Sequence, residues 1–267
     1  MRALAEAGEL RDTYVIFVSD NGFVQGEHRI EGGKAVPYES SIRVPLLVRG
    51  PGVARGAVAR DLVSNADVAA TVLEIAEAKA GLPVDGSSFL DVLAEPSILR
   101  GRAIPIESYR DDGFHGVRTD RYTYVKRHTG EVELYDLRVD PYQLQSVHED
   151  EQYAAAREAL ERLTEELKAC AGPDCERRPQ LRLDVRRREG EGERCGERAA
   201  VAIVGADADA VAAGLLAVDG RRLGAVGRSP RTVELDPGAS ASVRARVETI
   251  DGRLLTLEAE IPACGAA

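Results

Sequence analysis

The chain contains no tryptophan, and aromatic residues of all kinds make up only 4% of its 267 positions. It also lacks any apolar run of about 18 residues, the length that a membrane-spanning helix needs, so no transmembrane segment is expected. Basic residues are fewer than acidic ones, and the net charge is −10. Because an acidic protein is repelled by phosphate backbones, nucleic acid is not expected as a partner.

Several catalytic signatures are absent as well. The sequence has no phosphate-binding P-loop, no GxSxG nucleophile elbow and no HExxH zinc motif. The first ten residues have no apolar core of the signal-peptide type and resemble the end of an amphipathic helix. Such a helix has nothing before it to pack against, so we expect the chain to be part of a longer protein or of a truncated reading frame.

All four cysteines lie in the C-terminal part of the chain. Two interpretations are open: four scattered buried thiols, or two disulfides, Cys170–Cys175 across a tight turn and Cys195–Cys264 at the ends of a strand-rich segment. We favour the disulfides, which imply an oxidising compartment, so the protein is expected to be secreted, periplasmic or at the cell surface. A zinc site is not favoured, because no histidine lies near these cysteines.

One stretch near the start, residues 13–52, combines two apolar segments with a polar loop. Residues 14–18 (YVIFV) predict a central, parallel strand buried on both faces. The strand runs into Asp20, Asn21 and Gly22, and a second strand is expected over residues 44–48. Ligands of open α/β sheets bind beyond the carboxyl ends of the strands, so Asp20 and Asn21 lie where a site is expected.

The remaining periodicities predict a mixed fold. Helices are expected over residues 67–77 and 150–169, with a further helical turn at 89–93. Residues 103–107 predict a strand, and 116–137 alternate as strands around a turn at Thr129-Gly130. From Leu181 to Ile261 short alternating strands recur between Gly and Asp turns, which is typical of a small β-sandwich.

The polar residues of this loop have a functional interpretation and a purely structural one. Asp20 and Asn21 supply two of the roughly six to eight oxygen ligands that Ca²⁺ takes, but Asp-Asn-Gly is also a common turn. Lys34 follows two glycines and is suited to bind an anion, although most lysines are simply solvated surface residues. His28 suits a general acid or a substrate contact, and otherwise it is a surface histidine.

Taken in order, the motifs SDNG, GEHR, GGK, YESSIRVPLLVRGPG, SNADVAATVLEIA, DGSSF and ELYDLRVDPYQLQSV resemble the C-terminal half of the type I sulfatases, within the alkaline-phosphatase superfamily. The resemblance covers about residues 1–175 and is closest to N-acetylglucosamine-6-sulfatases and related bacterial arylsulfatases. It implies that Asp20 and Asn21 bind Ca²⁺, that Lys34 contacts the sulfate and that His28 lies near the substrate. It implies structural roles for Tyr38, Glu39 and Arg43.

The resemblance fixes the expected fold class as α/β. The chain should hold a partial sulfatase sheet with helices and a small antiparallel C-terminal sheet, followed by a small all-β sandwich. We assign residues 1–175 to the C-terminal portion of a sulfatase domain, residues 176–194 to a linker and first strand, and residues 195–267 to an immunoglobulin-like sandwich.

The departures from the family limit the expected activity. The sequence has no Cys/Ser-x-Pro-x-Arg motif, whose Cys or Ser becomes the formylglycine nucleophile, and it lacks the paired aspartates that complete the Ca²⁺ site. We therefore expect hydrolysis of sugar or aryl sulfate esters only together with the N-terminal half, and an inactive chain alone. The alternatives are a phosphodiesterase or phosphotransferase of the same superfamily, or a non-catalytic remnant that binds glycan or cell wall. The last is disfavoured because residues 176–267 contain no aromatic residue.

Overall fold

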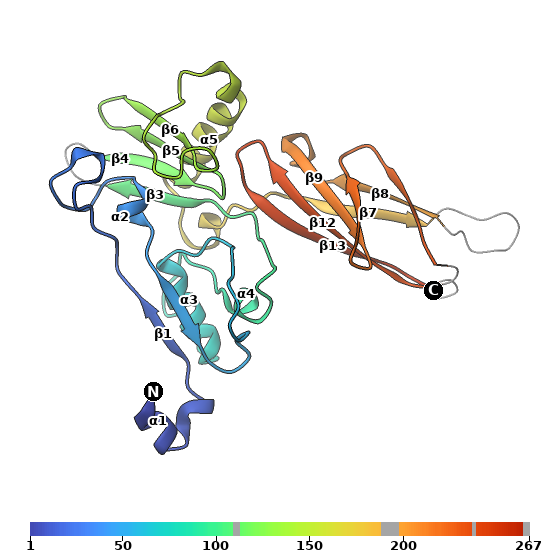
Figure 1. Cartoon of the computed structure of the whole chain (residues 1–267), viewed down its shortest axis with the longest axis horizontal. Coiled ribbons are helices and arrows are strands. Elements are labelled where there is room, and N and C mark those ends of the chain that lie inside the picture. Colours follow the sequence, from blue (N-terminus) through green and yellow to red (C-terminus); the bar gives the residue numbers. More distant parts are fainter. Residues whose placement is uncertain (109–112, 188–197, 237–238, 264–267) are drawn as a thin grey trace, which may run out of the picture. The chain divides into compact units, whose positions relative to one another are not determined.

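The computed structural model describes residues 1–108, 113–187, 198–236 and 239–263. The chain divides into two compact units (Figure 1). Unit 1 comprises residues 1–98 and 102–177, and unit 2 comprises residues 99–101 and 178–267. Cys195 and Cys264, and with them the predicted second disulfide, lie outside the described residues, as do positions 188–194 of the predicted linker.

The core of unit 1 is a sheet covered by one helix. Four strands pair antiparallel in sequence order: β3 (Ile104–Ser108), β4 (Phe114–Arg118), β5 (Tyr122–Arg127) and β6 (Val132–Asp136). Apolar residues of α5 (Ala154–Leu167) recur every three or four positions, so Leu160, Leu163 and Leu167 lie on one face and are buried with Tyr124 and Leu134. The small antiparallel sheet and the long helix are both as predicted.

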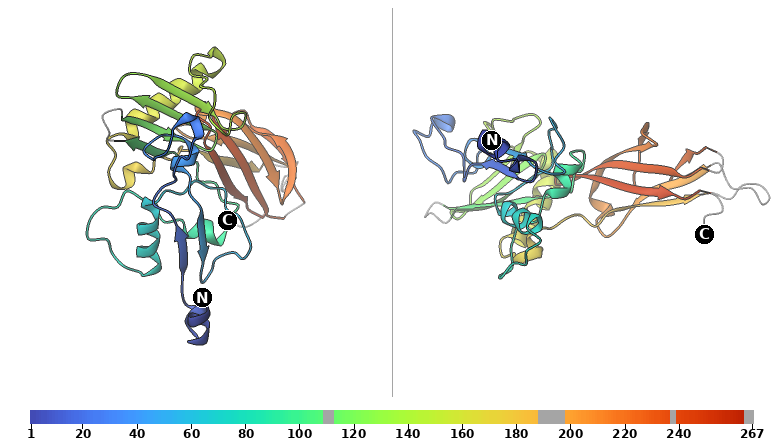
Figure 2. Two further views of the ribbon diagram at one scale, coloured as in Figure 1. Left: turned by 60° about the vertical axis from the view of Figure 1, so that its left-hand side comes forward. Right: turned by 90° about the horizontal axis from the view of Figure 1, so that it is seen from below.

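The predicted central parallel strand is wrong. β1 (Val15–Val18) pairs only with β2 (Leu46–Arg49) among the described residues, and the pairing is antiparallel. The two strands lie side by side, below the four-stranded sheet in Figure 1 and in the left view of Figure 2. The pair β1–β2 forms a two-stranded ribbon. Phe17 and Leu47 are paired across it and are 61% and 63% exposed. Between β1 and β2 the chain forms only the short turns η2 (Glu27–Arg29) and α2 (Glu39–Ile42), and it has no helix that crosses over as in a parallel βαβ unit.

Short elements complete unit 1. α3 (Ala66–Ile75) and α4 (Leu90–Ala94) match the expected helices within a few residues. The remaining helical turns are α1 (Arg2–Glu6), η1 (Glu9–Arg11), η2 (Glu27–Arg29), α2 (Glu39–Ile42), η3 (Glu151–Tyr153) and η4 (Gly172–Cys175). No helix of the described ranges is long and apolar enough to cross a membrane.

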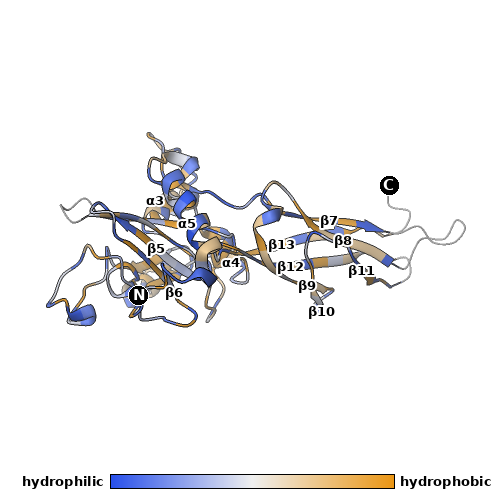
Figure 3. Ribbon diagram, turned by 90° about the horizontal axis from the view of Figure 1, so that it is seen from above, coloured by the Kyte–Doolittle hydropathy of each residue, from blue (hydrophilic) through white to orange (hydrophobic). Residues whose placement is uncertain are grey.

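Unit 2 is built from two antiparallel sheets that share one core. One sheet has the order β10 (Arg221–Ala225), β9 (Val211–Val218), β12 (Ala241–Thr249), β13 (Leu254–Ile261); the other has the order β11 (Arg231–Glu234), β8 (Arg198–Val204), β7 (Arg182–Arg187). Hydrophobic and hydrophilic residues follow one another along these strands (Figure 3). In β12 the alternation is strict, and every second residue faces the core. The buried residues include Ala241, Val243, Ala245 and Val247. A single turn, η5 (Ala208–Ala210), precedes β9.

Candidate functional site

The turn after β1 is held by a close backbone contact. The Gly22 N–H donates to the Ser41 carbonyl at 2.8 Å. A Cβ at position 22 would lie 2.1 Å from the Ser40 carbonyl oxygen, so only glycine permits this approach of the turn to α2. The Asp-Asn-Gly sequence thereby fixes Asp20 and Asn21 against the helix that follows the polar loop.

A second anchor comes from the start of α3. The side-chain amide of Asn65 donates to the backbone carbonyls of Ser19 and Asp20, at 3.1 and 2.7 Å. Asn65 was not predicted as a site residue, because the two segments that it joins are more than forty residues apart. The motif SNADVAATVLEIA was the available signal, since it resembles the family in the same order as SDNG.

Three of the predicted site residues come together in the structure. The Lys34 ammonium donates to Asn21 Oδ1 at 3.0 Å and lies 3.6 Å from Asp20 Oδ2. The Asn21 backbone N–H and the nearby Lys34 charge lower the pKa of Asp20 below its usual value of 3.8, so the carboxylate is ionised at neutral pH. Adjacent carboxylate and amide oxygens thus converge on a single cationic group.

These three residues line a broad cavity of unit 1 with a volume of about 1810 Å³. Its wall includes Phe17 of β1 and Leu47 of β2, together with charged residues such as Arg118. Asp20 and Lys34 are well exposed, with 79% and 55% of their side-chain surfaces accessible. An anionic group entering from solvent can therefore reach the ammonium.

His28 occupies a different position, because it lies in η2 and is not among the residues that line this cavity. Its imidazole stacks on the ring of Tyr38, with ring centroids 3.7 Å apart and an interplanar angle of 12°. The structure thus brings Asp20, Asn21 and Lys34 together and holds His28 on the same loop through an aromatic contact.

The residues matching YESSIR tie this loop to the sheet. Glu39 pairs with Arg118 of β4 at 2.9 Å, and its backbone N–H donates to the buried side chain of Gln143 at 2.7 Å. Arg43 forms a longer pair with Glu39 at 3.5 Å and is itself exposed. Gln143 belongs to the segment ELYDLRVDPYQLQSV, so two motifs distant in sequence meet in space.

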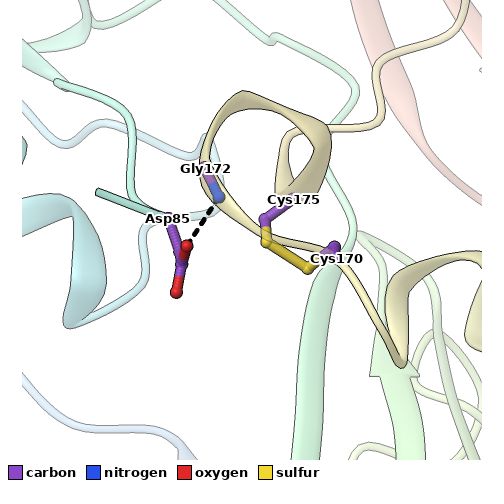
Figure 4. Close-up of a disulfide and its surroundings, with 4 residues drawn as sticks. All are labelled: Asp85, Cys170, Gly172 and Cys175. Carbon is purple, nitrogen blue, oxygen red and sulfur yellow. Dashed lines mark hydrogen bonds between the residues drawn. A yellow bond between two sulfur atoms is a disulfide. The ribbon is translucent and has the colours of Figure 1, made fainter. Parts of the chain in front are cut away.

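The predicted disulfide Cys170–Cys175 is present. It closes the η4 turn, and the Gly172 N–H inside the turn donates to the Asp85 carboxylate at 2.7 Å (Figure 4). The Ser87 hydroxyl donates to Glu176 just beyond the turn. The bridge therefore holds the end of unit 1 against the segment DGSSF.

Comparison with known proteins identifies the family. The profile described as N-sulphoglucosamine sulphohydrolase, C-terminal, matches residues 26–170, just over half of the chain. N-acetylglucosamine-6-sulfatase of Bos taurus is 39% identical over 107 residues, which cover 40% of this chain and 19% of that protein. The chain belongs to the sulfatase family and corresponds to its C-terminal region, so the resemblance noted from the motifs is confirmed.

Solved structures agree. One enzyme, in complex with its substrate D-glucosamine-2-N,6-O-disulfate, matches with a TM-score of 0.58 and 28% identity over 62% of this chain and 36% of its own. The phosphonate monoester hydrolase of Agrobacterium radiobacter matches with a TM-score of 0.56 and 26% identity over 63% of this chain and 37% of its own. The chain spans less than two fifths of the length of these relatives.

Proposed function

We propose that this chain supplies the sulfate-binding part of a sulfatase that hydrolyses sugar or aryl sulfate esters. The observation that carries the proposal is the convergence of Lys34 with Asp20 and Asn21 in a chain of this family. The relative that holds a disulfated glucosamine favours a sugar sulfate as the substrate class. The disulfide favours a secreted, periplasmic or cell-surface protein.

Lys34 is the anion-binding residue in this proposal. Its ammonium neutralises the charge on the sulfate oxygens, which is the electrostatic stabilisation that ester hydrolysis needs. The resemblance of the GEHR motif to the family assigns His28 the proton transfer to the leaving alcohol, although its ring stacks on Tyr38 and is not among the groups that line the cavity. The sequence contains no Cys/Ser-x-Pro-x-Arg motif, so the formylglycine nucleophile has to come from the N-terminal half.

The side chains of Asp20 and Asn21 fit part of a Ca²⁺ site. Both are hard oxygen ligands, and both already contact one cation, the Lys34 ammonium. In the part of the chain that the structure describes, no group of three or more His, Cys, Asp or Glu side chains is placed to hold a metal. Bound beside Asp20 and Asn21, Ca²⁺ would polarise the sulfate oxygens, with its other ligands supplied by the N-terminal half.

Binding to the chain itself tests the proposal. Titration of isotope-labelled chain with glucosamine 6-sulfate, followed by NMR, should shift the signals around Lys34. Lys34→Ala should remove these shifts, whereas Lys79→Ala, at another exposed lysine, should keep them. Unaltered binding by Lys34→Ala contradicts the proposal.

Two further measurements address activity and metal. The chain alone should not hydrolyse 4-nitrophenyl sulfate, because it has no nucleophile motif. Calorimetry with Ca²⁺ should show weak binding or none, since two ligands are too few. Turnover that Lys34→Ala abolishes would count against the first expectation, and sub-micromolar Ca²⁺ affinity against the second.

A phosphonate or phosphate ester hydrolase of the same superfamily is the second candidate, and the match to a phosphonate monoester hydrolase favours it. Titration with a phenyl phosphonate monoester distinguishes the two. Binding tighter than that of glucosamine 6-sulfate would favour this candidate.

A further inference from the structure

The loop that carries His28 is closed at its base. Val24 is fully buried, and its backbone N–H and carbonyl exchange hydrogen bonds with Gly33 at 2.8 and 3.1 Å. Lys34 follows this bridge directly, and His28 lies inside the loop. Any contact that fixes the loop therefore also fixes the start of the segment holding the Lys34 ammonium.

The backbone of the loop is unfavourable at its turn. His28 and Arg29 both have left-handed conformations, with φ of 54° and 60°. Residues other than glycine adopt this region only where the surroundings hold them there, and such positions cluster at functional sites. Backbone hydrogen bonds from Arg29 and Ile30 close the turn, and the stack of His28 on Tyr38 ties it to the rest of unit 1.

Tyr38 is in turn held by β5 and β6. Its hydroxyl donates to Glu133 Oε2 at 3.2 Å, and the Tyr135 hydroxyl donates to the same oxygen at 2.7 Å. Arg127 donates to Glu133 Oε1 at 2.8 Å, which compensates the mostly buried carboxylate. Burial and the nearby Glu133 charge raise the pKa of Tyr38 above its usual value of 10.0, so its hydroxyl remains a donor.

We propose that Tyr38 and Glu133 are positioning residues for the anion site: Glu133 holds Tyr38, Tyr38 holds the His28 ring, and the fixed loop presents Lys34 to a sulfate ester. The proposal rests on the proposed function for its ligand. The stack and the hydrogen bonds that carry it are independent of that function.

Histidine NMR tests the stack directly. The chain has four histidines, so His28 can be assigned by the signal lost in His28→Gln. In the native chain the ring current of Tyr38 should change the chemical shifts of the His28 ring protons. Tyr38→Leu should abolish that effect, because it removes the ring. Tyr38→Phe and Glu133→Gln should each reduce it, because they keep the ring and remove or weaken the hydrogen bond that holds it. Tyr142→Leu, at a 76% exposed tyrosine, is the matched control and should change nothing.

Titration with glucosamine 6-sulfate tests the positioning role. Tyr38→Leu and Glu133→Gln should each weaken binding about tenfold. This is the factor expected if Lys34, no longer held in place, loses one hydrogen bond to the charged sulfate. Tyr38→Phe should recover part of the loss, because it keeps the ring. Far-UV circular dichroism confirms that each variant is folded, and Glu133→Gln provides a test should Tyr38→Leu fail to fold.

The outcomes separate the two proposals. An unchanged His28 signal in Tyr38→Leu, or native affinity in both Tyr38→Leu and Glu133→Gln, overturns the positioning role alone. If the native chain does not bind the sugar sulfate, or binds it as well in Lys34→Ala, the proposed function fails, and the positioning role fails with it because there is no ligand to position.

Discussion

Asp67 has no exposed surface, and its carboxylate receives four hydrogen bonds. Two come from the Arg102 guanidinium at 2.5 and 3.0 Å, and two from the backbone N–H groups of Ser64 and Ser87. The carboxylate therefore joins the start of α3, the DGSSF segment and the approach to β3. A fully compensated buried charge of this kind becomes costly as soon as one partner is removed.

Arg102→Leu should lower the free energy of unfolding of unit 1 by about 3–5 kcal/mol, because it leaves the Asp67 charge buried without its counter-ion. Urea unfolding followed by tyrosine fluorescence measures this. Arg43→Leu is the matched control: its guanidinium is 77% exposed, and its loss should cost no more than about 1 kcal/mol. Equal destabilisation by the two variants would contradict the expectation.

At this scale the sequence singles out candidate site residues but not the residues that support them. Asp20, Asn21 and Lys34 lie in short motifs after a strand and contact one another in the structure, and their roles stay a prediction. The Tyr38–Glu133 contact joins residues 95 positions apart. No local pattern of one sequence reveals such a pair, because the fold alone brings its members into contact.

At the scale of elements, the β1–β2 ribbon is the exposed part of unit 1. A two-stranded sheet is marginal in water unless a further strand or layer covers it, and its free edges are templates for pairing with another chain. Here the exposed cross-strand pair Phe17–Leu47 adds apolar surface to those edges. The isolated chain is therefore expected to self-associate through this ribbon.

Sedimentation velocity should show concentration-dependent association of the native chain. Replacing the pair, Phe17→Thr with Leu47→Thr, should shift the distribution toward monomer, because threonine keeps strand propensity and removes the apolar surface. Leu215→Thr is the control: Leu215 is 62% exposed, but its strand β9 is paired on both sides. Association that persists in the double variant, or that the control reduces equally, would be evidence against this.

Strong periodicity decided which elements were predictable. The helix α5, the meander β3–β6 and the strict alternation of β12 were all expected. β1 was placed wrongly because a short apolar run looks the same whether other strands bury it or it lies open in a two-stranded ribbon. The conformation at Phe17 depends on which strands are available to pair with it, and five residues do not encode that.

At the scale of the whole molecule, the two units have separate hydrophobic cores. The ionisation of the buried Asp136 carboxyl group makes the stability of unit 1 depend on pH. It is 1% exposed and is held by Arg121, whose guanidinium donates at 2.7 Å. Burial alone would raise the pKa of Asp136, but the hydrogen bonds and charge of Arg121 outweigh it and lower the pKa below 3.8.

A lowered pKa means that the folded state binds the proton less readily than the unfolded one, so the stabilisation is complete above pH 3.8 and is lost as the pH falls through the folded-state value. Unit 1 should therefore lose stability below about pH 4. Asp136→Asn should be less stable at neutral pH and less sensitive to acid, whereas Asp12→Asn, at an exposed position, should follow the native chain. Thermal unfolding across this pH range checks both, and native-like acid sensitivity in Asp136→Asn would be the contrary result.

The β-sandwich contains no aromatic residue, so it contributes no aromatic absorbance or fluorescence. All tyrosines and phenylalanines of the chain belong to unit 1, and tryptophan is absent throughout. Near-ultraviolet absorbance and intrinsic fluorescence therefore report on unit 1 alone, whereas far-ultraviolet dichroism reports on both units. Comparing the two signals in one unfolding experiment separates the units without cutting the chain or adding a label. A tryptophan introduced into the core of unit 2 would give that unit a fluorescent reporter of its own.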